Sequence, residues 1–170
     1  MLFSQCGEKN QISPTEFVKL SFDEVLPASK SLTKKKQAEY LYKYVIGRIN
    51  KRKNKDSIDY ILEQMGSSEF MDGNPHMENY LLQAKGFYDL NYSGPEKAIP
   101  HIRQALHQAK QNPDLDLLEA YHNLSVCFYY TENMKDSALH YWRIAYKEAE
   151  FRNDSLKVFL FSSNLGAYYY

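Results

Sequence analysis

Apolar residues recur at helical spacing along most of the chain from Thr33 onward. The stretches with this spacing run for roughly 10–20 residues, which is the usual length of helices in globular proteins. Clusters of Gly, Pro, Asn and Asp separate them, for example at 71–75 and 91–95. No stretch combines sustained apolar–polar alternation with the β-branched composition of a strand. The pattern therefore predicts an all-α protein.

Several helix ends can be placed from single residues. Pro95 suits the first position of a helix, where its missing N–H costs nothing. Asp114 is predicted to cap the helix that follows it, and Asp154 or Ser155 to cap the last helix. Pro100 lies one turn into the helix that begins at Pro95, where a proline ring clashes with the preceding turn. We therefore expect a kink or a later helix start at this point.

Small residues and, three positions further on, aromatic residues recur at a spacing of 41 residues. A second column of small residues recurs at 40–41 residues in the following helices. Antiparallel helices approach closely only where a small side chain faces a large one, so these columns predict stacked helical hairpins. The columns are Ala84, Ser125 and Gly166; Phe87, Phe128 and Tyr169; and Ser57, Ala98 and Ala138.

The segment Leu124-Ser125-x-x-Phe128, which has a counterpart at 165–169, resembles the first helix of a tetratricopeptide (TPR) repeat. In that family a Leu precedes a small residue, and an aromatic residue follows three positions later. The pattern of Ala, bulky residue and Ala at 138–145 resembles the second TPR helix. The similarity indicates membership of the TPR class of helical repeats.

The resemblance covers residues 76–170 well and 33–65 loosely. It departs from the family in its period of 40–41 residues, against 34, and the proline that closes a repeat appears only as Pro113. It implies a right-handed superhelical solenoid of antiparallel hairpins over residues 31–170, with the last hairpin incomplete. The first helix of each hairpin is then expected to line a concave groove.

The resemblance also implies which residues face that groove. In many TPR domains an Asn before the Leu hydrogen-bonds the backbone of an extended peptide, and an amide offers both a donor and an acceptor for this. Tyrosines spaced 41 apart are expected to form a ladder of contact rings. In the alternative interpretation, the asparagines belong to the helix seams and the tyrosines to the core. The predicted groove residues are Lys85, Tyr88, Glu119, His122, Asn123, Tyr129, Asn164 and Tyr170.

Residues 1–30 are less periodic and are predicted to form an N-terminal segment with a short helix that ends at Pro27. The first seven residues are similar to the end of a bacterial lipoprotein signal, with Cys6 as the lipidated residue. Leu2 and Phe3 are too short for the apolar part of such a signal, and Gln5 fits it poorly. Two interpretations stay open, a remnant of a signal and a chance match.

Charged residues are unevenly distributed along the chain. The chain has 21 basic and 21 acidic residues, but 30–55 contain ten Lys or Arg against the single acid Glu39, which makes this segment +9. Such a stretch can attract nucleic acid, an anionic membrane or an acidic partner, although most runs of this kind are solvated helix faces. Nucleic acid is not the favoured partner, and a membrane is expected only if Cys6 carries a lipid.

Motifs for enzyme chemistry are missing from the sequence. It contains neither a phosphate-binding glycine loop nor a His-Glu-x-x-His or Gly-x-Ser-x-Gly segment. Two cysteines provide neither a disulfide framework nor a zinc site, and Cys127 lies in an apolar run typical of a core. We therefore expect no catalysis, no metal and no cofactor.

The sequence thus predicts a module that binds a protein or an extended peptide in a concave groove. The TPR resemblance suggests the input region of a bacterial signalling or envelope protein, in the envelope or in the cytoplasm. One alternative is a self-association scaffold, because the apolar final helix lacks a partner and is expected to pair with another copy or with a later part of a longer protein. The other alternative is a binder of nucleic acid or anionic membrane through 30–55.

Overall fold

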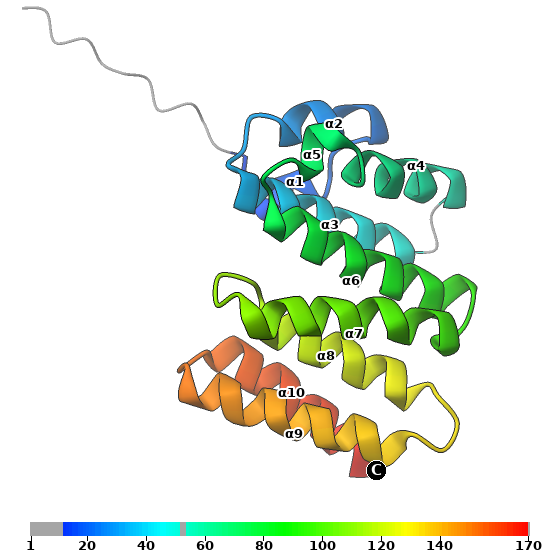
Figure 1. Cartoon of the computed structure of the whole chain (residues 1–170), viewed down its shortest axis with the longest axis vertical. Coiled ribbons are helices and arrows are strands. Elements are labelled where there is room, and N and C mark those ends of the chain that lie inside the picture. Colours follow the sequence, from blue (N-terminus) through cyan, green and yellow to red (C-terminus); the bar gives the residue numbers. More distant parts are fainter. Residues whose placement is uncertain (1–11, 52–53, 170) are drawn as a thin grey trace, which may run out of the picture.

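The computed structural model describes residues 12–51 and 54–169. All regular secondary structure in these ranges is helical, which confirms the all-α prediction (Figure 1). The helices are α1 (Pro14–Phe17), α2 (Phe22–Ser29), α3 (Lys34–Asn50), α4 (Lys55–Met65), α5 (Ser68–Met71), α6 (Pro75–Tyr92), α7 (Pro95–Gln111), α8 (Leu117–Tyr129), α9 (Lys135–Phe151) and α10 (Ser155–Tyr169).

The helices form an elongated stack, in which α4 and α5 lie with α2 at one end, α6 follows α3, and α7, α8 and the pair of α9 and α10 come after it (Figure 1). Helices α6 and α7 form one tight hairpin, α8 and α9 form a second, and α10 packs on α9. The two hairpins meet where α7 packs on α8. At the other end α3 packs directly on α6, whereas α4 contacts α3 far less extensively than α7 contacts α6. The first hairpin is therefore more open than the later ones.

Buried hydrophobic side chains form two clusters, one over residues 17–84 and one over 98–161. Phe17 and Val25 are fully buried in the same cluster as Leu41 on α3. Residues 12–30, predicted as a segment separate from the repeats, therefore share a core with α3. Cys127 is a core residue as expected, and burial raises the pKa of its thiol to about 12, so the thiol stays protonated at neutral pH.

The predicted helix ends are partly right. Pro95 is the first residue of α7, and the Asp154 side chain caps α10. However, α7 begins before Pro100 and continues through it, so the prediction of a later start is wrong. Pro100 is exposed, so water can hydrate the carbonyl that loses its helical partner. Asp116 rather than Asp114 caps α8, and Pro27 lies inside α2 instead of ending it.

Gly86 on α6 is in close contact with α7, and the predicted seam residue Ala84 two positions before it is fully buried. A methyl group built at Gly86 would overlap Cδ1 of Ile102 on α7 and lie 2.6 Å from its Cγ1. Ser125 and Ala138 are fully buried, as expected for small residues in a helix seam. Gly166 on α10 has open space around it instead. The small-residue column therefore includes both packed and open positions.

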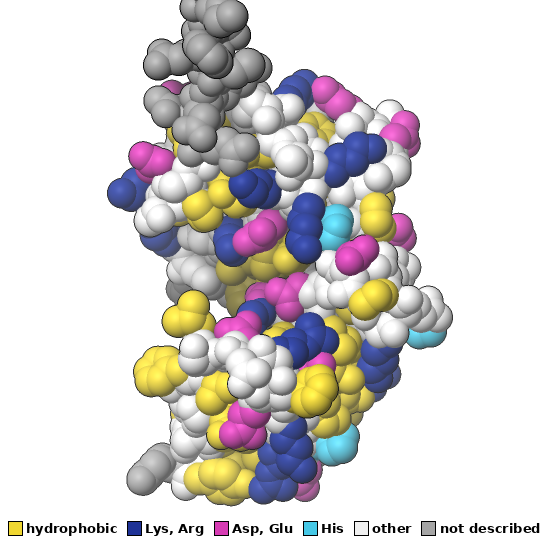
Figure 2. Space-filling model, turned by 90° about the vertical axis from the view of Figure 1, so that its left-hand side faces the viewer, with side chains coloured by type: hydrophobic (Ala, Val, Ile, Leu, Met, Phe, Trp, Pro, Cys, Tyr) yellow, Lys and Arg dark blue, Asp and Glu magenta, His cyan; other side chains and the backbone are white. Residues whose placement is uncertain are grey.

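Apolar side chains are exposed near the last two helices. Phe151 at the end of α9 and Leu156 and Phe159 on α10 are each more than 70% exposed. Hydrophobic side chains also gather at this level of the molecule in Figure 2. This is the surface at which the sequence predicts self-association.

Among the described residues, no helix combines the length and the apolar character that crossing a membrane requires.

Candidate functional site

Side chains from α3, α6, α8 and α10 surround a cleft of about 490 Å³. Figure 2 shows a hollow at mid-height of the molecule, with hydrophobic side chains inside it and acidic and basic side chains along its edge. The lining combines tyrosine rings with carboxylates and ammonium groups. The lining residues are Glu39, Tyr42, Lys43, Ile46, Gly47, Asn50, Tyr80, Asp116, Glu119 and Lys157.

Two tyrosines stack within the cleft. The rings of Tyr42 on α3 and Tyr80 on α6 have centroids 4.8 Å apart and planes inclined by 26°. The Tyr42 hydroxyl donates a hydrogen bond of 3.0 Å to Oε1 of Glu119 on α8. Burial, followed by the charge of Glu119, raises the pKa of Tyr42 well above its ordinary value. Tyr42 therefore remains a neutral hydrogen-bond donor that connects α3 to α8.

An ion cluster forms one wall of the cleft. Nζ of Lys157 lies 2.8 Å from Oε2 of Glu119 and 3.3 Å from Oδ2 of Asp116. Burial by itself raises the pKa of the Glu119 carboxyl, but Lys157, His122 and Tyr42 bring it below its ordinary value. Burial likewise opposes the charge of Lys157, and the two carboxylates still raise its pKa. Glu119 and Lys157 are therefore both charged at neutral pH, and the two ion pairs of Lys157 connect the first turns of α8 and α10.

A buried chain of amides supports the cleft from behind. Nδ2 of Asn123 donates to the Tyr42 hydroxyl at 2.9 Å and to Oε1 of Gln83 at 2.8 Å. Gln83 donates to Oδ1 of Asn79 at 2.7 Å, and Asn79 donates to the Ala105 carbonyl at 2.8 Å. The three amide side chains belong to residues at most 2% exposed. Together with the ion cluster they connect α7, α6, α8, α3 and α10 in one hydrogen-bonded network.

This network places Asn123 differently from the predicted peptide contact. Both donor positions of its amide are occupied inside the protein, so Asn123 is not offered to a ligand on the surface. The position agrees with the alternative interpretation of a helix-seam residue. The cause is the direct packing of α3 beside α6, which covers the inner face of α8 with Tyr42. The amides Asn79 and Gln83, four residues apart on one helix, were the sequence signal that the prediction missed.

Asn164 and His122 lie beside one another near the ion cluster. Asn164 Nδ2 and His122 Nδ1 are 3.5 Å apart, and both residues are half-buried. The His122 ring also packs against Phe161, with centroids 5.7 Å apart. Burial lowers the pKa of His122, and Lys157 adds to this effect while Glu119 opposes it. His122 is therefore neutral at neutral pH.

The tyrosine ladder is not visible in the described part of the chain. Tyr88 packs on Tyr92, with ring centroids 4.8 Å apart, and Tyr129 packs on Trp142 at 5.6 Å. Neither Tyr88 nor Tyr129 lines the cleft. Lys85 is exposed and does not line the cleft either. Of the predicted groove residues, Glu119 does line it. Two further predicted site residues, Tyr170 and Cys6, lie outside the described residues.

We expect Asn123→Ala to lower the free energy of unfolding by about 1–3 kcal/mol, because it leaves Gln83 and Tyr42 without a buried partner. Urea denaturation followed by circular dichroism measures this change. Asn164→Ala is the matched control and should cost less than about 0.5 kcal/mol, since its side chain is half-buried and makes one long contact. Equal stability of the two variants would contradict a structural role for Asn123.

Cations of the basic segment have partners within the protein at several positions. Lys30 forms an ion pair with Glu69 at 2.6 Å, and Lys34 donates to the Asp72 carbonyl at 2.7 Å. Arg48 donates to a backbone carbonyl at 2.8 Å. These cations hold α2 and α3 against neighbouring segments.

In the described part of the chain, no three His, Cys, Asp or Glu residues are grouped so that they could hold a metal ion.

Comparisons of the chain with protein-family models, with curated proteins and with solved structures gave no match. A function is therefore inferred from the geometry of the cleft and not from a relative.

Proposed function

We propose that this protein is a binding module that holds a segment of another polypeptide in the cleft between α3, α6, α8 and α10, without catalysing a reaction. The observation that carries this proposal is the cleft itself, about 490 Å³ in volume and lined from four helices. In the TPR-like arrangement that we also propose, these four are the first helices of successive hairpins. The resemblance predicts that such helices line a concave groove.

The buried network favours binding because it fixes the cleft in advance. Tyr42, Glu119 and Lys157 are each held by at least two neighbours before any partner arrives. A side chain that is already ordered loses little conformational entropy on association. The same network explains why polar residues are buried in the middle of the stack, where apolar residues of similar size would fill the seam.

The lining suggests the chemistry of the bound segment. Three carboxylates and two ammonium groups line the cleft, which gives the lining a net charge of −1. Gly47 has no side chain, and a methyl group built there would have no neighbour within 4 Å, so a backbone can approach α3 at this point. Asn50 provides an amide beside it. An extended segment with a basic side chain complements this surface.

We expect Gly47→Leu to fill the cleft and to weaken peptide binding by at least about tenfold, or about 1.4 kcal/mol. Linear peptides are first selected from a displayed random library on the wild-type protein. Their dissociation constants are then measured by titration calorimetry. Gly47→Leu should fold at least as well as the wild type, since leucine favours a helix and the position is open.

Gln104→Leu serves as the matched control, because Gln104 is exposed on α7 and does not line the cleft. The selected peptides should bind this variant as tightly as the wild type. If they bind Gly47→Leu equally well, or if Gln104→Leu weakens them to the same extent, the cleft is not the binding site.

A further inference from the structure

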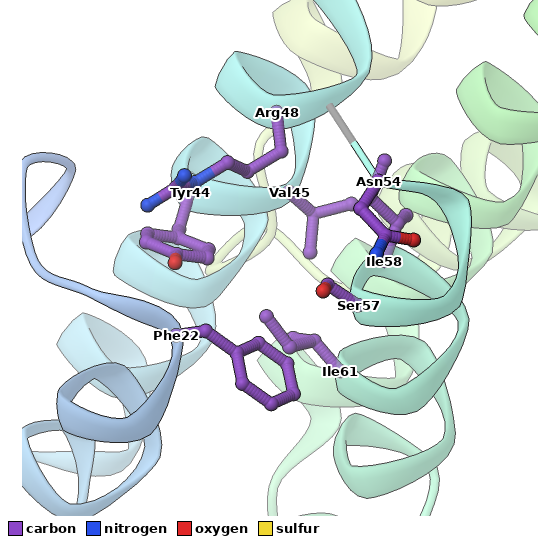
Figure 3. Close-up of a pocket in the computed structure, with 8 residues that line it drawn as sticks. All are labelled: Phe22, Tyr44, Val45, Arg48, Asn54, Ser57, Ile58 and Ile61. Atoms are coloured by element: carbon purple, nitrogen blue, oxygen red, sulfur yellow. The ribbon is translucent and has the colours of Figure 1, made fainter. Parts of the chain in front are cut away.

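A second pocket, of about 120 Å³, lies between α2, α3 and α4 (Figure 3). It opens at Ser57, the first residue of the small-residue column Ser57, Ala98 and Ala138. Ala98 and Ala138 are fully buried in their helix seams, whereas the corresponding Ser57 is half-buried and faces the pocket. The pocket thus occupies space that a closely packed hairpin would fill. Its lining residues are Phe22, Tyr44, Val45, Arg48, Asn54, Ser57, Ile58 and Ile61.

The interior of this pocket is apolar. Val45, Ile58 and Ile61 are at most 1% exposed, and the ring of Phe22 lies beside Ile61 and across the pocket from Val45 in Figure 3. Apolar cavities of roughly 150 Å³ in proteins stay dry and bind molecules the size of benzene. A volume of about 120 Å³ therefore suits one small ring or a short branched hydrocarbon chain.

The polar groups at the pocket are hydrogen-bond donors. Arg48 is held in place because it donates to the Leu20 carbonyl at 2.8 Å and lies 4.6 Å from the centre of the Tyr44 ring. A guanidinium has five N–H donors, so further ones remain for a ligand. The side-chain oxygen of Ser57 points toward the middle of the pocket in Figure 3. Within the described chain this hydroxyl has no hydrogen-bond partner.

Charge around the pocket favours an anion. Asn54 uses its Oδ1 to cap the Asp56 N–H at 2.9 Å, which leaves its Nδ2 as a donor. No acidic residue belongs to the described lining. Asp23 contributes negative charge near Tyr44, but it neither lines the pocket nor forms an ion pair with Arg48 in the described ranges. An acceptor that carries negative charge therefore complements Arg48 and Ser57.

We propose that this pocket binds a small free carboxylic acid with a single ring or a short branched hydrocarbon tail. The tail packs against Val45, Ile58 and Ile61, and the carboxylate accepts hydrogen bonds from Arg48 and Ser57. The volume admits one such tail and little more, which favours a free acid over the end of a polypeptide. This site is independent of the cleft between α3, α6, α8 and α10.

The test is a titration of the whole chain with phenylacetate, followed by backbone amide signals in ¹H–¹⁵N spectra. Saturable shifts at amides of α2, α3 and α4 are expected. Phenylacetamide has the same ring without the charge and should bind at least about tenfold more weakly. Absence of saturable shifts, or equal binding of the amide, would overturn the assignment of a carboxylate site.

Two variants locate the site. Ser57→Leu fills the pocket and should abolish the shifts while the protein stays folded. Glu63→Leu, at an exposed position of the same helix outside the pocket, should bind phenylacetate like the wild type. Unchanged binding to Ser57→Leu would place phenylacetate elsewhere and refute the proposal. The last comparison uses a short peptide that ends in phenylalanine. If this peptide binds more tightly than phenylacetate, the choice of a free acid as the ligand is refuted.

Discussion

Replacing Gly86 with alanine is expected to lower the free energy of unfolding by about 1–3 kcal/mol, although alanine is the better helix former. The added methyl group would overlap Cδ1 of Ile102 and approach the Ala98 carbonyl to 3.3 Å. Ile102 is fully buried, so its side chain has no free space into which it can turn. Either α6 and α7 move apart or Ile102 leaves its preferred rotamer, and both cost free energy.

Gly47→Ala is the matched control for this prediction. Gly47 also lies inside a helix, but nothing is within 4 Å of a methyl group built there. That variant should gain up to about 1 kcal/mol from helix propensity. Both changes are measured by urea denaturation, and Ile102→Val, which removes Cδ1, should partly rescue Gly86→Ala. If Gly86→Ala is as stable as Gly47→Ala, the two helices are not in the close contact described here.

The second large effect is expected for Lys157→Met, which should cost about 2–3 kcal/mol at neutral pH. The change leaves the carboxylates of Glu119 and Asp116 without their cation. Removing one partner of a fully buried ion pair costs roughly 3–5 kcal/mol. The side chains here are 20–33% exposed, so solvent reduces the effect. Lys147→Met is the control, because Lys147 is exposed on α9, and it should change stability by less than about 0.5 kcal/mol.

The pH dependence of the Lys157→Met effect distinguishes lost charge pairing from lost packing. In the wild type the folded-state pKa of Glu119 lies below its ordinary value of 4.5. The contribution of Glu119 to the free energy of unfolding is therefore present above pH 4.5 and is lost as the pH falls through the folded-state pKa. In the variant, burial is left as the main influence and raises this pKa above 4.5, so protonation of Glu119 stabilises the folded state.

The difference in unfolding free energy between wild type and Lys157→Met should consequently shrink as the pH falls below the ordinary carboxyl value. Urea denaturation across the acid range measures this difference. A difference that stays constant with pH would show that Lys157 stabilises the protein through the packing of its hydrocarbon chain alone.

The sequence by itself determined the helices and much of their packing. Apolar periodicity identifies the buried stripe of each helix, because helices in a stack must cover that stripe. The end signals at Pro95 and Asp154 depend on local backbone geometry, which neighbouring residues specify. The burial of Ser125 and Ala138 also followed from a local rule, since a close helix seam needs small side chains.

The tertiary structure alone decided which polar residues meet. Asn123 and Tyr42 are 81 residues apart in sequence, and Lys157 and Glu119 are 38 apart. Their contacts depend on how α3, α8 and α10 pack, and a helical repeat specifies the face of a residue without specifying its neighbour. For this reason Asn123 was predicted as a surface contact and is a buried one. The cleft and the pocket at Ser57 have the same origin, because both are spaces between helices whose separation is set by packing and not by local sequence.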